Sequence, residues 1–511
     1  MSASTFLRGT KLIFNFQFLS FFCRNKRTNG VFLFPCGEPG KNKYTFRYLC
    51  LPLNPTIPSS QMRINDLTQG SIFRSLWIMA VPLISASFIQ MAYSMTDMLW
   101  LGHLGSEAVA AAGAAGFFTW LCNALSFLTK IGAEITVSQS IGAKDRQRAG
   151  HYAGQAVTLS VLLSFIYACF ILWAAPSLIG LFRFDASIST QAVRYMRIIA
   201  PGLFFQFNNN TFSGLYNGQG DSKTPFRISS IGLIVNILLD PLLIYGIGPF
   251  PALGTAGAAI ATALAQLVVY SLFCRRIFSK SFPLNPIRLF NRIKPAFARH
   301  ILLLGLPVSL QNALFSMFSL TLATLAAQWG AVGVAAQSIG SQIEAISWMT
   351  AAGFSTALAA FTGQNYGAGN YDRIRQGYQL TLGIAGGIGL LAGALFFIFN
   401  RPIFSLFVTE PEAIAAGGDY LKILSLSQLF MITESVTAGA FNGTGRTTPP
   451  ALVGSIFTGL RIPMAYLLTT VPALGLTGIW WSITISSILK GTILPLWFVH
   501  FQSRKLKQIV R

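Results

Sequence analysis

The chain has 511 residues, of which 53% are hydrophobic and only 10% are charged. Soluble domains carry roughly 25% charged residues, so this chain lacks the charged surface that a water-soluble domain needs on all sides. The net charge of +22 does not indicate nucleic-acid binding, because the basic residues gather in short loops between apolar runs. The composition therefore predicts an all-α integral membrane protein.

Residues 1–61 form an N-terminal extension without a clean membrane span. The apolar stretch Leu12–Phe22 is typical of a signal peptide, but Asn15 and Gln17 interrupt it and no small-residue cleavage site follows. We interpret the extension as a disordered tail or a mis-annotated start, with Met62 as the true start. A peptide from residues 1–61 in the mass spectrum of the native protein would contradict this hypothesis.

The rest of the chain alternates long apolar runs with short polar turns. A helix needs about 20 apolar residues to cross the hydrocarbon core of a bilayer, and helices cross lipid because they satisfy their own backbone groups. The basic loops place both chain ends in the cytoplasm by the positive-inside rule. The predicted spans are residues 73–98, 106–138, 151–174, 190–216, 226–248, 254–275, 298–327, 331–362, 375–400, 414–440, 450–470 and 475–499.

An internal repeat relates the two halves of this pattern. A shift of 225 positions lays Pro82 over Pro307 and Asn217 over Asn442. Six crossings return the chain to the side from which it started, so both halves insert in the same orientation, as in transporters built from parallel repeats. We predict twelve transmembrane helices in two pseudo-symmetric six-helix lobes, residues 62–281 and 282–511, that rock around a central cavity.

Ionisable groups inside a span are energetically expensive and are therefore functional candidates. Asp240 is the strongest, because Asn236 lies one turn earlier on the same helix face. Pro241 should bend the helix and leave backbone acceptors unpaired. This pattern indicates a proton or cation site, and the alternative is a helix-end aspartate in contact with interfacial water.

Asp97 is the second candidate, in the first span and fifteen residues after Pro82. A low dielectric and a nearby acid both disfavour the charged form of a carboxyl group, so such a group can bind and release a proton. The alternative is that Asp97 lies near the outer surface and supports the turn at Gly102–Gly105. We predict that Asp97, Asn236 and Asp240 couple transport to an ion.

Four other charged residues lie within the spans. Lys130 and Glu134 are four residues apart, which predicts an internal ion pair, and we expect few other basic residues at membrane depth. Glu344 and Glu434 are either binding-site carboxylates or structural hydrogen-bond anchors.

Carboxylates among aromatic and apolar side chains suit cationic amphiphiles. Met95 and Trp348 are candidates to line such a cavity, with core or lipid contact as the alternative for each.

Motifs for other chemistry are missing from the sequence. The cysteines and histidines lack metal-ligand spacing, no phosphate-binding loop is present, and no clustered catalytic set is recognisable. We therefore predict no enzymatic activity, no cofactor and no metal site, and an ion gradient as the driving force.

The sequence resembles the multidrug and toxic compound extrusion (MATE) family from Met62 to about His500. The resemblance rests on Pro82 and Asp97 together with five motifs in the same order as in the family. These motifs are Gly102-His-Leu-Gly105, Gln139-Ser-Ile-Gly-Ala-Lys144, Asn217-Gly-Gln-Gly-Asp-Ser-Lys-Thr-Pro225 with Asn236-x-x-x-Asp240-Pro241, and Asn442-Gly-Thr-Gly-Arg446.

The resemblance implies twelve helices in two lobes and export driven by proton or sodium entry. In the DinF-like branch of the family, an acid in the first span, an Asn/Asp pair in the fifth and bending at the first-span proline accompany proton coupling. Here these positions are Asp97, Asn236, Asp240 and Pro82. In the NorM-like branch, an acid in span seven helps to bind sodium.

The position that matches this span-seven acid is Phe315 in the present sequence. The NorM-like branch also has an acid in span ten, and its position falls near Met431, one turn before Glu434. These departures favour protons over sodium, although Glu344 or Glu434 could substitute.

We therefore predict a monomeric, multi-pass antiporter in the cytoplasmic membrane of a bacterium. It would export cationic or amphiphilic drugs or metabolites in exchange for protons, or less readily sodium, and contact membrane lipids but no nucleic acid. The alternative is a flippase for lipid-linked saccharides or other lipids, which should have a more cationic cavity.

Overall fold

The computed structural model describes residues 64–247, 249–280, 282–284, 287 and 292–509. The prediction for residues 1–61 lies outside them. In the described part of the chain all regular structure is helical, which confirms the predicted all-α class. The first six helices are α3 (Ile72–Gly102), α4 (Ser106–Gly142), α5 (Arg146–Gly180), α6 (Ala186–Gly218), α7 (Lys223–Tyr245) and α8 (Thr255–Ile277).

The second half of the chain repeats this order with more breaks. Its elements are α9 (Pro295–Ala326), the 3₁₀ turn η2 (Ala327–Trp329), α10 (Gly330–Gly367), α11 (Tyr371–Ile398), the short α12 (Asn400–Phe404), α13 (Pro411–Ser425), α14 (Gln428–Gly443), α15 (Thr448–Gly459), α16 (Arg461–Thr469) and α17 (Thr477–Ile509). Helices α13 and α14 meet at a bend of 52°.

Local sequence explains where several of these helices begin. The Ser71 side chain accepts a hydrogen bond from the Arg74 backbone N–H at the start of α3, and Asp145 caps α5 in the same way through Arg148. Gly105 and its repeat partner Gly330 have φ angles of 112° and 68°. Because such backbone conformations favour glycine, both positions can hold the tight turn that separates two long helices.

The helices account for the twelve predicted spans. Nine described helical stretches are long and apolar enough to cross a membrane, and α13 with α14 adds a tenth as a bent pair. The stretch Pro295–Gly367 has 73 residues, about 110 Å of helix, and contains two spans because it turns at Gly330. The twelfth is α6, whose run Gln206-Phe-Asn-Asn-Asn210 makes it too polar for the same test.

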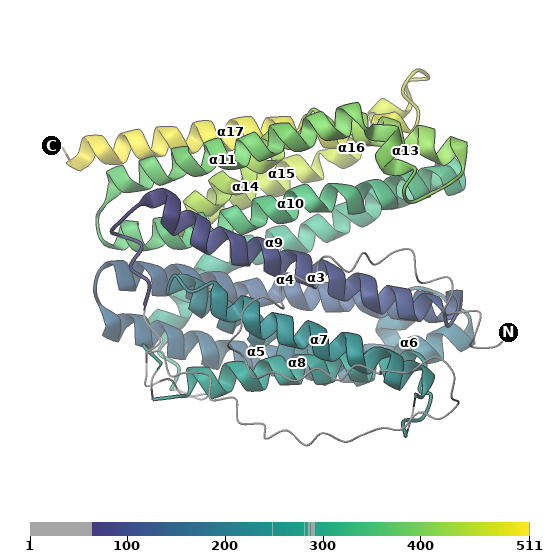
Figure 1. The fold of residues 1–511 in the computed structure, drawn as a ribbon, viewed down its shortest axis with the longest axis horizontal. Coiled ribbons are helices and arrows are strands. Elements are labelled where there is room, and N and C mark those ends of the chain that lie inside the picture. The colour runs from purple at the N-terminus through teal and green to yellow at the C-terminus, as the bar shows by residue number, and fades with distance from the viewer. Residues whose placement is uncertain (1–63, 248, 281, 285–286, 288–291, 510–511) are drawn as a thin grey trace, which may run out of the picture. The chain divides into compact units, whose positions relative to one another are not determined.

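The helices form two groups that lie beside each other (Figure 1). Helices α3–α8 build the first lobe and α9–α17 the second, and each lobe has two buried apolar clusters. At one end the lobes exchange helix segments. Leu76 and Met79 of α3 pack into the core of the second lobe, while Ile301 of α9, the repeat partner of Leu76, packs into the core of the first.

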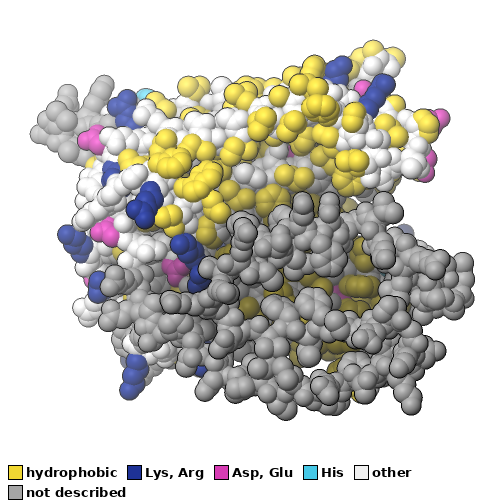
Figure 2. Space-filling view, viewed as in Figure 1, with side chains coloured by type: hydrophobic (Ala, Val, Ile, Leu, Met, Phe, Trp, Pro, Cys, Tyr) yellow, Lys and Arg dark blue, Asp and Glu magenta, His cyan; other side chains and the backbone are white. Residues whose placement is uncertain are grey.

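The outer surface is apolar in the middle and basic at one end. Figure 2 shows hydrophobic side chains spread over the second lobe, with Lys and Arg concentrated at the end where α17 terminates. Phe165 and Trp173 of α5 are 60% and 81% exposed. A water-soluble monomer rarely presents such a surface, whereas lipid contact accounts for it.

The two lobes are joined by a pseudo-symmetric seam at this basic end. The Gln139 side chain on α4 donates a hydrogen bond to the Gly443 carbonyl at 2.9 Å, and its repeat partner Gln364 on α10 donates to the Gly218 carbonyl at 3.2 Å. A Cβ atom at Gly142 would collide with the Gln364 carbonyl, and one at Gly367 with the Gln139 carbonyl. Glycine at both positions therefore permits the close approach of α4 and α10.

A short segment before α3 also bridges the lobes at the seam. Asn65 binds the first lobe, because its backbone N–H donates to the Gln219 carbonyl and its side chain to the Gly220 carbonyl. Leu67 binds the second lobe, because its backbone N–H donates to Gln364 at 2.8 Å. The seam therefore closes the basic end, which the positive-inside rule predicts to be cytoplasmic.

Candidate functional site

The predicted ion-coupling residues lie together inside the first lobe. Asn236 and Asp240 on α7 are fully buried, and the Asn236 amide donates a hydrogen bond to Asp240 Oδ1 at 3.2 Å. Asp97 on α3 faces them and interacts electrostatically with Asp240. The Thr262 hydroxyl on α8 donates a hydrogen bond to Asp97 Oδ2 at 3.4 Å. Three helices thus converge on one pair of acids.

No basic side chain offsets this pair. Among the described residues, the titratable neighbours that act on the two carboxyl groups are Tyr93 and Tyr195, and neither supplies a positive charge. Asp97 Oδ1 and Asp240 Oδ2 are buried and have no hydrogen-bond partner. Because two neighbouring carboxylates in a low dielectric repel each other, the arrangement favours a pair that holds at least one proton.

The two prolines lie within continuous helices. Helix α3 runs through Pro82 and α7 runs through Pro241. Bending at either proline therefore stays a prediction about another conformation of the transporter.

A second charged cluster lies inside the second lobe, where Glu344 and Glu434 are found. Lys490 on α17 forms an ion pair with Glu434 on α14 at 2.9 Å, with side chains only 8% and 13% exposed. Glu344 accepts a hydrogen bond from the Tyr420 hydroxyl at 3.2 Å. Arg461 donates to Ser486 and Ser487 and interacts electrostatically with both glutamates.

This cluster corrects two expectations. Basic residues at membrane depth are more numerous than we predicted, because Arg461 and Lys490 are both buried within spans. Lys130 and Glu134 do not form the predicted ion pair, since Lys490–Glu434 is the ion pair within 4 Å in the described part of the chain. The Lys130 ammonium lies instead over the Phe127 ring, 4.9 Å from its centre.

The same sequence signal that singled out the buried acids could have found these bases. Arg461 stands in the middle of the predicted span 450–470, and Lys490 in the span 475–499. A charge at such depth needs a partner of opposite sign. Two acids and two bases in four spans therefore already indicate a balanced network.

The two candidate cavity residues lie in different lobes and are both accessible. Met95 on α3 is 52% exposed and Trp348 on α10 is 47% exposed. Glu344, one turn before Trp348, is partly buried. A role in substrate binding stays a prediction for all three.

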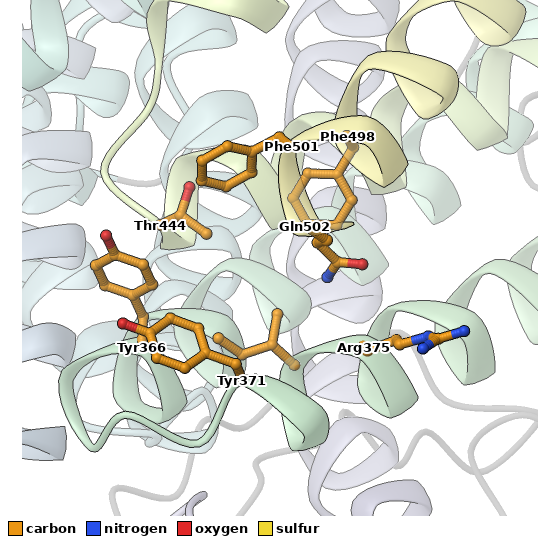
Figure 3. Close-up of a pocket in the computed structure, with 8 residues that line it drawn as sticks. Tyr366, Tyr371, Arg375, Thr444, Phe498, Phe501 and Gln502 are labelled. Atoms are coloured by element: carbon orange, nitrogen blue, oxygen red, sulfur yellow. The ribbon is translucent and has the colours of Figure 1, made fainter. Parts of the chain in front are cut away.

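A small pocket lies away from both charged clusters, at the basic end of the second lobe. Tyr366, Tyr371, Arg375, Thr444, Phe498, Phe501 and Gln502 line it (Figure 3). Its wall is largely aromatic and carries one charged side chain. In the described residues no group of three His, Cys, Asp or Glu side chains could hold a metal ion, and Cys122, Cys169 and Cys274 are free thiols.

The chain is similar to known proteins in sequence and in fold. The chain is 29% identical over 452 residues to a probable multidrug resistance protein NorM of Thermotoga maritima, a match that covers 86% of this chain and 95% of that protein. A crystal structure of a MATE protein in the bent conformation superposes with a TM-score of 0.81 at 25% identity, covering 87% of this chain and 98% of that one. An outward-facing multidrug resistance MATE transporter gives a TM-score of 0.78 at 26% identity, covering 86% and 98% of the two chains.

The model of the MatE family matches the chain twice, at residues 82–242 and 307–467. The two matches begin at Pro82 and Pro307, which confirms the internal repeat. Proteins of this family are multi-pass membrane transporters and not enzymes, in agreement with the apolar helices described above. The chain belongs to the MatE family.

Proposed function

We propose that this transporter exports cationic or amphiphilic small molecules from the cytoplasm in exchange for protons. The observation that supports this most strongly is the pair of acids Asp97 and Asp240 inside the first lobe, on which no basic side chain acts in the described structure. Such a pair changes its charge by binding or releasing a proton, and negative charge attracts cations. The multidrug resistance names of the similar proteins support export as the direction of transport.

The proposed cycle links protonation to the shape of α3. Protons that enter from outside neutralise Asp97 and Asp240 while the transporter faces outward. The neutral pair no longer holds a cationic substrate, and a bend of α3 at Pro82 then reduces the cavity of the first lobe and expels it. Release of the protons to the cytoplasm resets the pair, with Asn236 as a hydrogen-bond partner of Asp240 in both states.

Sodium coupling through the second lobe has less support. A sodium site built on a carboxylate needs that carboxylate to be free of a cationic partner. Here Lys490 neutralises Glu434, and Arg461 acts on both glutamates. The same balance weakens the flippase alternative, because two acids offset the two buried bases and the region is not cationic overall.

Ethidium efflux from cells that express the chain tests this proposal. We expect a proton gradient imposed alone to drive efflux and a sodium gradient imposed alone to fail. Asp97→Asn and Asp240→Asn should each reduce proton-driven efflux by about a hundredfold, an effect of roughly 2.7 kcal/mol. Glu107→Gln is the control, because Glu107 is an exposed acid in the first turn of α4 and only accepts a hydrogen bond from Ser187 and Gln191. Full efflux by Asp240→Asn at normal expression would contradict the proposal.

A further inference from the structure

Glu134 on α4 is a buried carboxyl group for which the proposed cycle has no role. The side chain is 3% exposed, and neither carboxyl oxygen has a hydrogen-bond partner in the described structure. A buried carboxylate that lacks both water and donors is strongly destabilised, and such a group takes up a proton instead. The geometry of this site therefore favours the neutral acid.

The charged neighbour of Glu134, Lys130, does not stabilise its carboxylate through an ion pair. Lys130 precedes Glu134 by one helical turn, but its ammonium group lies over the Phe127 ring and outside ion-pair distance of the carboxylate. Lys130 is the one charged group that acts on Glu134 among the described residues, from α4 or from any helix packed against it. The ammonium therefore attracts the carboxylate only from a distance.

A proton on Glu134 would satisfy two unpaired atoms at once. Asn217 on α6 lies beside the carboxyl group, and its Oδ1 atom is also buried without a partner. This amide oxygen and a carboxylate are both acceptors and cannot bind each other, so an ionised Glu134 can pair only with the amide N–H group of Asn217. A carboxylic acid can donate its O–H to the amide oxygen. The neutral acid thus completes a hydrogen bond to Asn217 Oδ1, an atom that the ionised form leaves unpaired.

This pair of residues is attached directly to the seam between the lobes. Asn217 precedes Gly218, whose carbonyl accepts the hydrogen bond from Gln364 of the other lobe at 3.2 Å. Gly218 also packs on the Glu134 backbone, since a Cβ atom there would lie 2.8 Å from the Glu134 carbonyl oxygen. A change in the Glu134–Asn217 contact therefore acts on a residue that closes the cytoplasmic side.

We propose that Glu134 is an inner proton-binding site that stabilises the closed seam while protonated and releases its proton when the seam opens. On opening, water reaches the carboxyl group, its O–H bond breaks, and the proton passes to water on the cytoplasmic side. The carboxylate that remains is then stabilised by water and by Lys130. The inference rests on the proposed proton coupling and adds a second proton site to the Asp97–Asp240 pair.

The sign of the pH effect follows from this difference in proton binding. The closed state holds one more proton at Glu134 than the open state, so raising the pH favours opening. Spin labels at Ala143→Cys and Ala368→Cys can report this equilibrium. Both positions are exposed, and each follows the last residue of a helix at the seam, α4 or α10. The labels are placed in the full chain with its six native cysteines replaced by serine.

The experiment measures the distance between the labels across a pH series in detergent, without any substrate. We expect the closed population to fall as the pH rises in the otherwise unchanged protein. Glu134→Gln should remain closed at every pH, because glutamine is neutral and can donate to Asn217. Asn217→Ala should shift the equilibrium about fivefold to tenfold toward opening at low pH, because it removes the acceptor of the acid proton. Glu107→Gln is the control and should follow the parent protein.

Two results would overturn the inference. One is a Glu134→Gln protein that opens with pH as the parent does, which would assign the response to other groups. The other is an Asn217→Ala protein with an unchanged equilibrium. If Glu134→Gln fails to fold, the infrared band of protonated carboxyl groups decides in a protein that carries Asp97→Asn and Asp240→Asn. The remaining intensity should fall with Asn217→Ala, and an unchanged band would overturn the inference. The distances require no transport, so failure here is distinguishable from failure of proton-driven efflux.

Discussion

The two lobes bury their charged side chains in opposite ways. In the first lobe, Asp97 and Asp240 face each other with no base acting on them in the described structure. In the second, Glu434 and Glu344 share their surroundings with Lys490 and Arg461. Acids with permanent counter-charges can stay ionised through a transport cycle, whereas acids without them respond to charge by binding or releasing protons. The comparison supports our proposal that proton exchange belongs to the first lobe, with a charge-balanced structure in the second.

The largest expected effect is the loss of one member of the second-lobe ion pair. Lys490→Met leaves Glu434 buried without its partner, which should destabilise the protein by about 3–5 kcal/mol. The double variant Lys490→Met with Glu434→Met should recover most of this loss, because it removes both charges. Thermal unfolding in detergent measures the difference. Lys130→Met removes a lysine outside any ion pair and should destabilise the protein far less. An equal destabilisation by Lys130→Met would contradict the difference between the two lobes.

A smaller effect is expected at the seam, where the lobes are alike. Gly142→Ala and Gly367→Ala each place a Cβ atom against a carbonyl of the other lobe, so each should destabilise the closed state by about 1–3 kcal/mol. The spin-label distance between positions 143 and 368 measures this change. Gly113→Ala is the matched control on α4, because nothing lies within 4 Å of the added atom. A large effect at only one of the two seam glycines would contradict the symmetry.

The bridging segment before α3 should give a still smaller effect. Arg373 donates hydrogen bonds to the Gln69 and Gly70 carbonyls at 2.9 and 2.8 Å, so Arg373→Met should loosen this segment by about 1 kcal/mol. Faster hydrogen exchange at residues 65–70 would show it. Arg375→Met, which changes a neighbouring exposed arginine, should leave the exchange rate as it was.

The smallest expected effect on stability belongs to the residues with the largest expected effect on transport. Asp240→Asn replaces a carboxyl group with a neutral amide of the same shape. The free energy of unfolding should therefore change by less than about 1 kcal/mol, measured as a small shift of the melting temperature. A loss as large as that of Lys490→Met would mean that Asp240 is ionised and paired in the resting protein. That result would remove the distinction between the lobes.

Sequence reasoning predicted the fold well because the duplicated pattern was strong. The offset that pairs Pro82 with Pro307 located both lobes, and the apolar runs located the helices. The exchange of Leu76 and Ile301 between the lobe cores was not predictable, because periodicity shows that a helix face is apolar but not which lobe it contacts. The same limit applies to the seam, where Gln139 and Gln364 look like ordinary helix-end amides in the sequence.

The candidate site was predicted in part. Spacing along one helix placed Asn236 beside Asp240, and that hydrogen bond is present. Spacing failed for Lys130 and Glu134, because a separation of four residues brings two side chains to one face without fixing their rotamers. Partners from distant spans, such as Lys490 for Glu434, depend on the packing of α14 against α17 and could not be assigned from one sequence.

Proton release on substrate binding tests the assignment of the two lobes most directly. Purified protein in weakly buffered detergent is mixed with ethidium, and a pH indicator reports the protons released. We expect release from the parent protein and from the Lys490→Met, Glu434→Met double variant, and none from the Asp97→Asn, Asp240→Asn double variant. Release that survives loss of both aspartates but disappears with the second-lobe pair would contradict the assignment.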